Sequence, residues 1–103
     1  MKIEKRSTMQ FEGGAPALDS VPTMNRHFRL QWEPAQQAHV LLYAEGMVTL
    51  NGSAGAILSR CDGQRTVAQI IADLEQAYAR KELGGDVLAF LSIARDNRWV
   101  QLQ

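Results

Sequence analysis

The sequence predicts an α+β fold of the winged-helix type, in which an N-terminal three-stranded antiparallel β-sheet is followed by a three-helix bundle. Two strand-like runs meet at Glu45-Gly46, and the second leads directly into a short helical segment that ends at Asp62-Gly63. Two more helical patterns begin near Thr66 and near Asp86. In such a fold, a partner would find a hairpin edge and the helix beside it.

Alternation of apolar and polar residues predicts the strands. The run 28–33 has the period of a half-buried strand, and Pro34 ends it because proline cannot donate to a sheet ladder. Residues 39–43 form the second expected strand and residues 47–50 the third. Gly46 supplies the turn between them, because glycine accepts positive φ at little cost. The result is a hairpin with one additional strand.

Capping residues and apolar spacing predict the three helices. Asn51 or Ser53 can cap the first helix, because a short polar side chain satisfies a free N–H. Thr66 and Gln69 have the spacing of a capping box for the second. Its apolar stripe has helical period and consists of Val67, Ile70, Ile71, Leu74 and Tyr78.

The third helix is expected to begin at Asp86, after Gly84-Gly85 has separated it from the second. An acidic residue suits the N-terminal end of the helix dipole. Val87, Phe90, Leu91 and Ala94 form its expected buried face. The last residues, from Trp99, are expected to return over the core.

The chain divides into two parts of different character. Residues 1–26 contain Gly13-Gly14-Ala15-Pro16 and Val21-Pro22 and show no periodic pattern, which predicts a flexible or partner-dependent tail. Residues 27–103 form the predicted winged-helix-like domain. The alternative for the tail is an arm that packs on a second copy, and a homodimer therefore stays open.

Composition restricts the functional classes. The chain has 103 residues, with 11 lysines and arginines against 11 acidic residues, so its formal net charge is zero. Nucleic-acid binders usually carry a basic excess, because phosphate contacts supply most of their affinity. No apolar run is long enough to cross a bilayer, and the N-terminus has no apolar secretory segment. With one cysteine an internal disulfide is excluded, and we expect a cytoplasmic protein without nucleic-acid or membrane partners.

No group of residues indicates catalysis, a metal or a cofactor. His27, His39 and Cys61 do not form the three or four convergent ligands that a zinc site needs. Cys61 falls on an apolar helix face, which is typical of a small buried residue. The segment 51–55 follows a strand and opens a helix but lacks the lysine of a phosphate-binding loop. We therefore predict a protein that is not an enzyme.

Protein recognition is the remaining class. An open strand edge can accept an extended peptide whose side chains fill a neighbouring groove. The candidate wall residues of such a groove are Leu50, Leu88, Leu91 and Arg95, although the three leucines can equally belong to the core. The alternative is a winged-helix DNA-binding regulator, in which the second or third helix enters the major groove. The outer face of the second helix includes Asp73, which suits that role poorly.

These features resemble the PqqD family of pyrroloquinoline quinone (PQQ) biosynthesis over residues 28–103. The resemblance depends on the order and spacing of several motifs. They are Arg29-Leu-Gln-Trp-Glu33, Val40-Leu-Leu-Tyr-Ala-Glu-Gly46, Leu50-Asn51, Cys61-Asp-Gly-Gln-Arg-Thr-Val67, Asp86-Val-Leu-Ala-Phe-Leu91 and Trp99. Residues before about 26 lie outside it.

The resemblance implies a peptide chaperone without a cofactor of its own. The family binds the precursor peptide PqqA and delivers it to PqqE, a radical S-adenosylmethionine enzyme that cross-links a glutamate and a tyrosine of the peptide. Related recognition elements hold a leader peptide as an added strand between the third strand and the third helix. On this sequence those are residues 47–51 and 86–95, and the implied peptide-binding residues are Met47, Val48, Thr49, Leu50, Asn51, Asp86, Leu88, Leu91 and Arg95.

Overall fold

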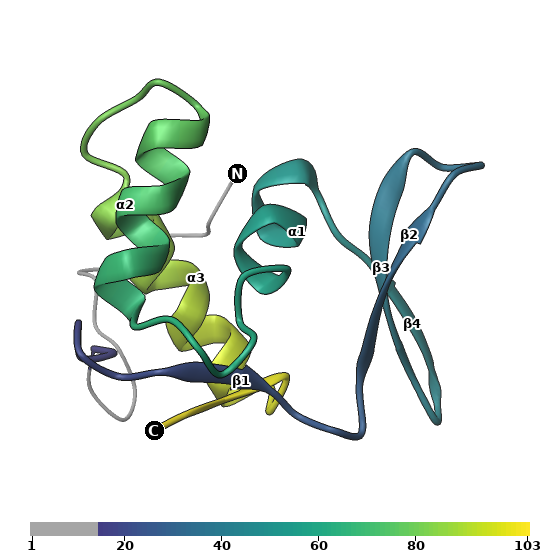
Figure 1. Ribbon diagram of the computed structural model, residues 1–103. Helices are drawn as coiled ribbons and strands as arrows, with labels where there is room; N and C mark the ends of the chain where they lie inside the picture. The colour runs from purple at the N-terminus through teal and green to yellow at the C-terminus, as the bar shows by residue number, and fades with distance from the viewer. Residues whose placement is uncertain (1–14) are drawn as a thin grey trace.

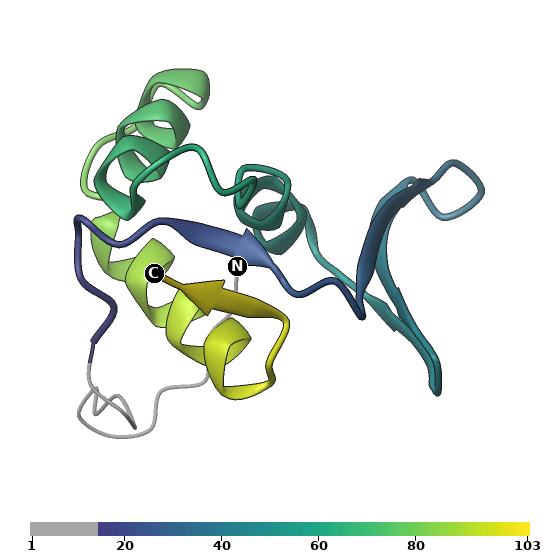
Figure 2. The ribbon, with the colours of Figure 1, turned by 60° about the horizontal axis from the view of Figure 1, so that its bottom comes forward.

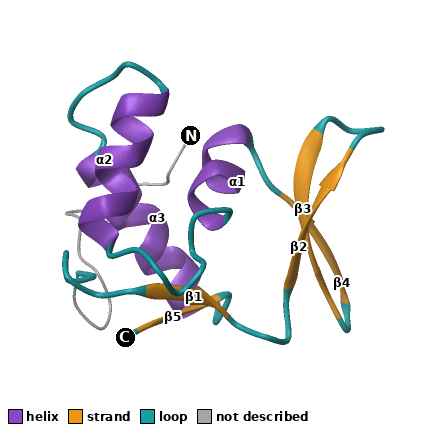
Figure 3. Cartoon of the chain, in the orientation of Figure 1, coloured by secondary structure: helices purple, strands orange, loops and turns teal. Residues whose placement is uncertain are grey.

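The computed structural model describes residues 15–103, which form five strands and three helices (Figure 1). In chain order these are β1 (Pro22–Met24), β2 (Arg29–Glu33), β3 (Ala38–Tyr43), β4 (Gly46–Thr49), α1 (Gly52–Leu58), α2 (Val67–Ala77), α3 (Gly84–Asp96) and β5 (Val100–Leu102). Figure 3 shows β2, β3 and β4 standing apart from the helices, whereas β1 and β5 lie beside α3. The predicted α+β class, with a three-stranded sheet followed by three helices, is confirmed.

The strands form two separate antiparallel sheets. One has the order β2-β3-β4, and the other pairs β1 with β5. In the larger sheet Leu41 lies opposite Leu30 on one side and Val48 on the other. Directly opposed residues share a face of a sheet, so these three side chains form one apolar face. Leu41 is a member of the hydrophobic core, and Leu30 and Val48 pack against that core, which identifies this face as the one turned toward it.

The helices begin where their caps predict. The Asn51 side chain accepts a hydrogen bond of 2.8 Å from the N–H of Ala54 at the start of α1. Thr66 and Gln69 form both bonds of the capping box at the start of α2. These bonds satisfy N–H groups that have no partner inside the helix. Both caps are therefore local features that the sequence predicts correctly.

The core lies between the apolar face of the large sheet and the three helices. Its members come from β3, from all three helices and from the C-terminal strand, and α1 packs between the sheet and α2. The most deeply buried are Leu41, Leu58, Val67, Ile70, Leu91 and Ala94. Trp99 and Leu102 pack against this core, as expected for a chain end that returns over it.

The segment predicted as a tail, residues 1–26, differs from that expectation in its described part. Residues 22–24 form β1 and pair with residues 100–102 (Figure 2). Pro22 is buried, and the N–H of Val21 donates to the carbonyl of Gln103 at 2.9 Å. A strand of only three residues is too short to show a periodic pattern. Its pairing with residues 100–102 leaves no signal in the neighbouring sequence. Residues 1–14 lie outside the described residues.

Several helix boundaries also differ from the sequence prediction. Gly84 and Gly85 are the first residues of α3 and do not separate it from α2. The α2 helix ends at Ala77, so Tyr78 is its C-cap and is half exposed instead of continuing the buried stripe. The first helix ends at Leu58, before the Asp62-Gly63 pair. The residue after the α2 C-cap, Ala79, has a positive φ of 52°, which lies outside the right-handed helical region and ends the helix there.

Candidate functional site

The backbone of β4 presents an open edge. Within the described residues, β4 pairs with β3 alone, so its other side has no strand partner. The N–H of Leu50 donates to the carbonyl of His39 at 3.0 Å. Hydrogen-bonded and non-bonded pairs alternate in an antiparallel ladder, so the backbone groups of Met47 and Thr49 point away from β3. These groups can accept an added strand.

The side chains of the predicted segment 47–51 alternate in exposure. Met47 is 52% exposed, and the exposed Thr49 hydroxyl donates to Gln36 Oε1 at 3.4 Å. Val48 is half-buried, and Leu50 is buried in the core. Asn51 is occupied in capping α1. A strand added at this edge would therefore meet the side chains of Met47 and Thr49 and the outward-facing backbone groups of the same two residues.

The predicted residues of α3 face in different directions. Leu91 is fully buried in the core, whereas Asp86 is exposed. Leu88 is half-buried in a shallow groove that it shares with Leu18. Arg95 is half-buried and donates to Ser92 Oγ at 3.3 Å. As the protein stands, these four residues do not form one continuous wall.

The two expected sides of the peptide groove lie apart. Figures 1 and 2 show β4 and α3 on opposite sides of α1, and the two elements do not pack against each other. The resemblance implied a groove directly between residues 47–51 and 86–95. In this structure α1 fills that space, because its Gly55 packs against His39 of the sheet. The open edge and the third helix are thus connected through α1 and not by direct contact.

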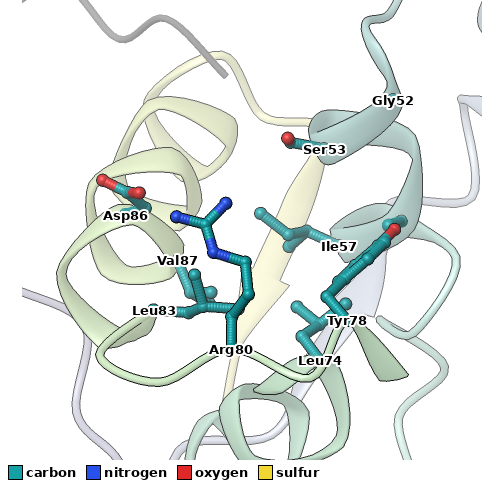
Figure 4. A pocket seen from close by; sticks show the side chains of 10 residues that line it. Gly52, Ser53, Ile57, Leu74, Tyr78, Arg80, Leu83, Asp86 and Val87 are labelled. Carbon is teal, nitrogen blue, oxygen red and sulfur yellow. The ribbon is translucent and has the colours of Figure 1, made fainter. Parts of the chain in front are cut away.

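A cavity of about 410 Å³ lies on the other side of α1, between α1 and the α2–α3 hairpin (Figure 4). Its first wall is the N-terminal turn of α1, which directly follows β4. Its second wall is the end of α2 with the first turn of α3. The lining residues are Gly52, Ser53, Ala56, Ile57, Leu74, Tyr78, Arg80, Leu83, Asp86 and Val87. Of the nine predicted site residues, Asp86 alone lines it.

Sequence reasoning missed this cavity because its walls come from chain reversals. Ala79 and Glu82 adopt positive φ values of 52° and 61°, and they turn the chain from α2 toward α3. Glu75 Oε2 accepts a 3.0 Å hydrogen bond from the N–H of Leu83 and holds this loop. Neither residue is a glycine, so the sequence carries no turn signal there. The run of charged residues after Tyr78 and the Gly84-Gly85 pair indicated a break between the helices but not its shape.

An ion-pair cluster joins the end of α1 to α2. Arg60 Nε lies 2.6 Å from Asp73 Oδ2, and Arg65 lies 3.6 Å from the same oxygen. The hydrogen bond from Arg60 is the main cause that lowers the pKa of Asp73, and the two positive charges add to it. Arg65 also lies 3.8 Å from Asp62. These arginines are engaged with neighbouring acids, which indicates a structural role.

The chemistry of the described residues does not indicate a reaction. Burial, with a smaller contribution from Asp62, raises the pKa of the Cys61 thiol to about 12, so the reactive thiolate is scarce at neutral pH. His39 packs edge-on against Trp32 with ring centroids 5.2 Å apart. Within residues 15–103 no group of three potential metal ligands comes together. In the same range, every helix is too short or too polar to span a bilayer.

The comparisons with known proteins agree on one family. The family model described as Coenzyme PQQ synthesis protein D (PqqD) matches residues 38–100. This chain belongs to the PqqD family. The "PqqA binding protein" of Stutzerimonas stutzeri strain A1501 is 51% identical to it over 87 residues, which are 84% of this chain and 95% of the relative. The protein of the same name from Pseudomonas aeruginosa strain UCBPP-PA14 is 53% identical over 89 residues, 85% of this chain and 97% of the relative.

A solved PqqD structure has the same fold. It is the solution NMR structure of the PqqD part of Methylobacterium extorquens PqqCD, a functional, stand-alone recognition element for ribosomally synthesized and post-translationally modified peptides. The TM-score is 0.72 at 31% identity, and the match covers 84% of this chain and 95% of that one. The resemblance inferred from the motifs is confirmed, and it extends beyond the residues 28–103 on which those motifs lie.

Proposed function

We propose that this protein binds the precursor peptide PqqA by strand addition to β4 and presents it to the radical S-adenosylmethionine enzyme PqqE. The observation that carries the proposal is the open edge of β4, where the backbone groups of Met47 and Thr49 have no strand partner. Two relatives that are about half identical to this chain are named for binding PqqA. The proposal extends that property to this protein.

Strand addition suits a disordered peptide. Backbone hydrogen bonds to an open edge give affinity that tolerates variation in sequence. Ordering the peptide costs about 2–5 kcal/mol of the gross interaction energy, so the acceptor edge has to be preformed. The hairpin provides this, since β4 is held by β3 along its whole length and ends in the core through Leu50. Met47, half exposed beside the edge, offers an adaptable apolar contact.

Presentation to an enzyme requires that the peptide stay accessible while bound. The β4 edge is at the periphery of the molecule, away from α2 and α3 (Figure 1). A peptide held there would keep the residues on at least one side of the paired segment free for a second protein. This supports a delivery role, in which the chemistry takes place in the partner enzyme.

Replacing a single β4 amide tests strand addition. Thr49→Pro removes an N–H that faces the open edge, so the internal ladder keeps its bonds. We expect synthetic PqqA to bind this variant several-fold to about tenfold more weakly, since one backbone hydrogen bond worth about 0.5–1.5 kcal/mol is lost. Isothermal titration calorimetry measures the affinity, and circular dichroism verifies the fold.

Thr49→Ala is the matched control. It removes the same hydroxyl, with its 3.4 Å contact to Gln36, but keeps the amide. We expect its affinity to stay within about twofold of the parent protein, because exposed side-chain hydrogen bonds contribute little. Equal affinities for folded Thr49→Pro and Thr49→Ala would exclude strand addition at this position.

The DNA-binding alternative receives no specific support. Helix α2 carries Asp73 in contact with Arg60 and Arg65, so two of the basic side chains beside it are already neutralised. The formal net charge of the chain is zero. A phosphate-binding face needs basic groups that are free to contact phosphates, because these contacts release counterions from the nucleic acid.

A further inference from the structure

The cavity between α1 and the α2–α3 hairpin combines an apolar floor with a charged mouth. Ile57, Leu74 and Val87 are buried and form the floor. Arg80 rises from the α2–α3 loop, and in Figure 4 its guanidinium lies between Asp86 and Ile57. An apolar floor with a few polar groups at the opening is typical of a pocket that receives one side chain of a ligand.

Arg80 is the basic group among the lining residues of this cavity, and its guanidinium is available to a ligand. The described residues 15–103 contain no ion pair or side-chain hydrogen bond to its guanidinium. Arg60 and Arg65, in contrast, both contact Asp73. A guanidinium presents paired N–H donors in a plane and is suited to a carboxylate. Asp86 on the opposite wall repels a carboxylate, so an acidic group is favoured on the Arg80 side.

The cavity lies close to the end of β4 along the chain. The strand ends at Thr49, and after two residues the chain enters α1 at Gly52, which lines the cavity together with Ser53. An extended chain advances about 3.3 Å per residue, so a peptide paired with Met47 and Thr49 reaches the first turn of α1 within a few residues. The same peptide can therefore occupy both the edge and the cavity.

We propose that this cavity is an anchor pocket for the bound peptide, which takes an apolar side chain between Ile57 and Val87 while Arg80 pairs with a peptide carboxylate next to it. This inference rests on the proposed function, because its occupant is the peptide held at β4. It predicts that the peptide segment beyond the paired strand is apolar and acidic. It also gives α3 a part in recognition through its first turn, Gly84 to Val87, and not through the buried Leu91.

Charge reversal at two adjacent positions tests the pocket. Arg80→Glu places a negative charge at the mouth, and Lys81→Glu makes the same change in net charge at a neighbouring exposed residue that does not line the cavity. With synthetic PqqA as the probe, we expect Arg80→Glu to weaken binding about tenfold or more, as charge-assisted hydrogen bonds do when lost. We expect Lys81→Glu to change it less than about threefold, the effect of exposed charge alone.

Two isoleucine methyl groups provide a second measurement on the unmodified protein. Ile57 lines the proposed pocket, whereas Ile71 lines the separate groove beside Leu18 and Leu88. In a protein with labelled isoleucine δ1 methyls, saturating PqqA should shift the NMR signal of Ile57 and leave that of Ile71 in place. This readout does not depend on any substitution.

The outcomes separate this inference from the proposed function. One outcome is that PqqA shifts the NMR signals of the β4 amides while the Ile57 methyl signal stays in place and Arg80→Glu binds PqqA as tightly as the parent protein does. That result would exclude the anchor pocket and leave strand addition intact. Equal weakening by Arg80→Glu and Lys81→Glu, with Ile57 unmoved, also overturns the pocket. If Arg80→Glu impairs only the binding of the loaded protein to PqqE, the pocket belongs to the enzyme interface and the inference fails. If PqqA does not bind the parent protein, both proposals fail.

Discussion

The contact between His39 and Gly55 sets how closely α1 approaches the sheet. A Cβ atom placed on Gly55 would lie 2.5 Å from His39 Nδ1 and 3.0 Å from His39 Cβ. Cβ atoms essentially never lie as close as 2.5 Å to a neighbouring side chain, so His39 or α1 would have to shift to admit any residue other than glycine. At the residue scale this close contact belongs to the packing of α1 on β3, and α1 lies between β4 and α3 (Figure 1).

Gly55→Ala should therefore destabilise the protein. Overpacking of a buried contact costs about 1–3 kcal/mol. The control is Gly52→Ala, also in α1, where an added Cβ meets nothing within 4 Å. We expect that control to be neutral or slightly stabilising, because alanine favours a helix more than glycine does. Urea unfolding followed by circular dichroism measures both, and equal midpoints would contradict the close packing.

At the scale of elements, helix α3 serves the core and two surfaces at once. Val87, Leu91 and Ala94 are buried against α2 and the C-terminal strand. Asp86 lies at the cavity beside α1, and Leu88 lies at the groove on the other side. A substitution on this helix therefore tests peptide recognition only when it avoids the buried positions.

Leu91 and Leu88 should respond differently to truncation. Leu91→Ala removes a fully buried side chain and should lower the free energy of unfolding by about 2–5 kcal/mol. Leu88→Ala removes a half-buried side chain and should cost clearly less. Thermal unfolding by calorimetry compares the two. A larger loss at Leu88 would mean that the assignment of the core is wrong.

The elements that the sequence predicts correctly are those with local signals. The capping box at Thr66 and the cap at Asn51 involve residues three positions apart. The hairpin strands follow from alternation and a glycine turn. The position of β4 relative to α3, and the burial of Leu50 and Leu91, depend on how α1 packs between distant elements. Spacing along the chain could not distinguish a groove wall from the core at these leucines.

The N-terminal segment organises the whole molecule. Its strand β1 pairs with β5, and Asn25 Nδ2 donates to the carbonyl of Arg98, 73 positions away, at 2.9 Å. Its carbonyls also accept from α2, since Ser20 receives the N–H of Val67 at 2.8 Å. Pairing across so long a separation has no local signature, which is why the sequence predicted a tail here. Residues 15–26 therefore form hydrogen bonds both to the C-terminal strand β5 and to the start of α2.

Deletion of this strand should weaken the whole fold. A variant that begins at Asn25 lacks β1 and the bonds from Ser20 and Val21, each worth about 0.5–1.5 kcal/mol. We expect the free energy of unfolding to fall by more than about 2 kcal/mol. A variant that begins at Ala15 keeps β1 and is the control. Urea unfolding of both variants measures the difference, and identical stabilities would show that β1 does not contribute.

The most direct test of the account is an NMR titration of the labelled protein with synthetic PqqA, following the backbone amides. We predict saturable shifts that are largest at Met47 and Thr49, the two amides that face the open edge of β4. The β2 edge on the other side of the sheet should change little. Shifts confined to β2, or a well-dispersed spectrum that PqqA leaves unchanged, would contradict peptide binding at β4.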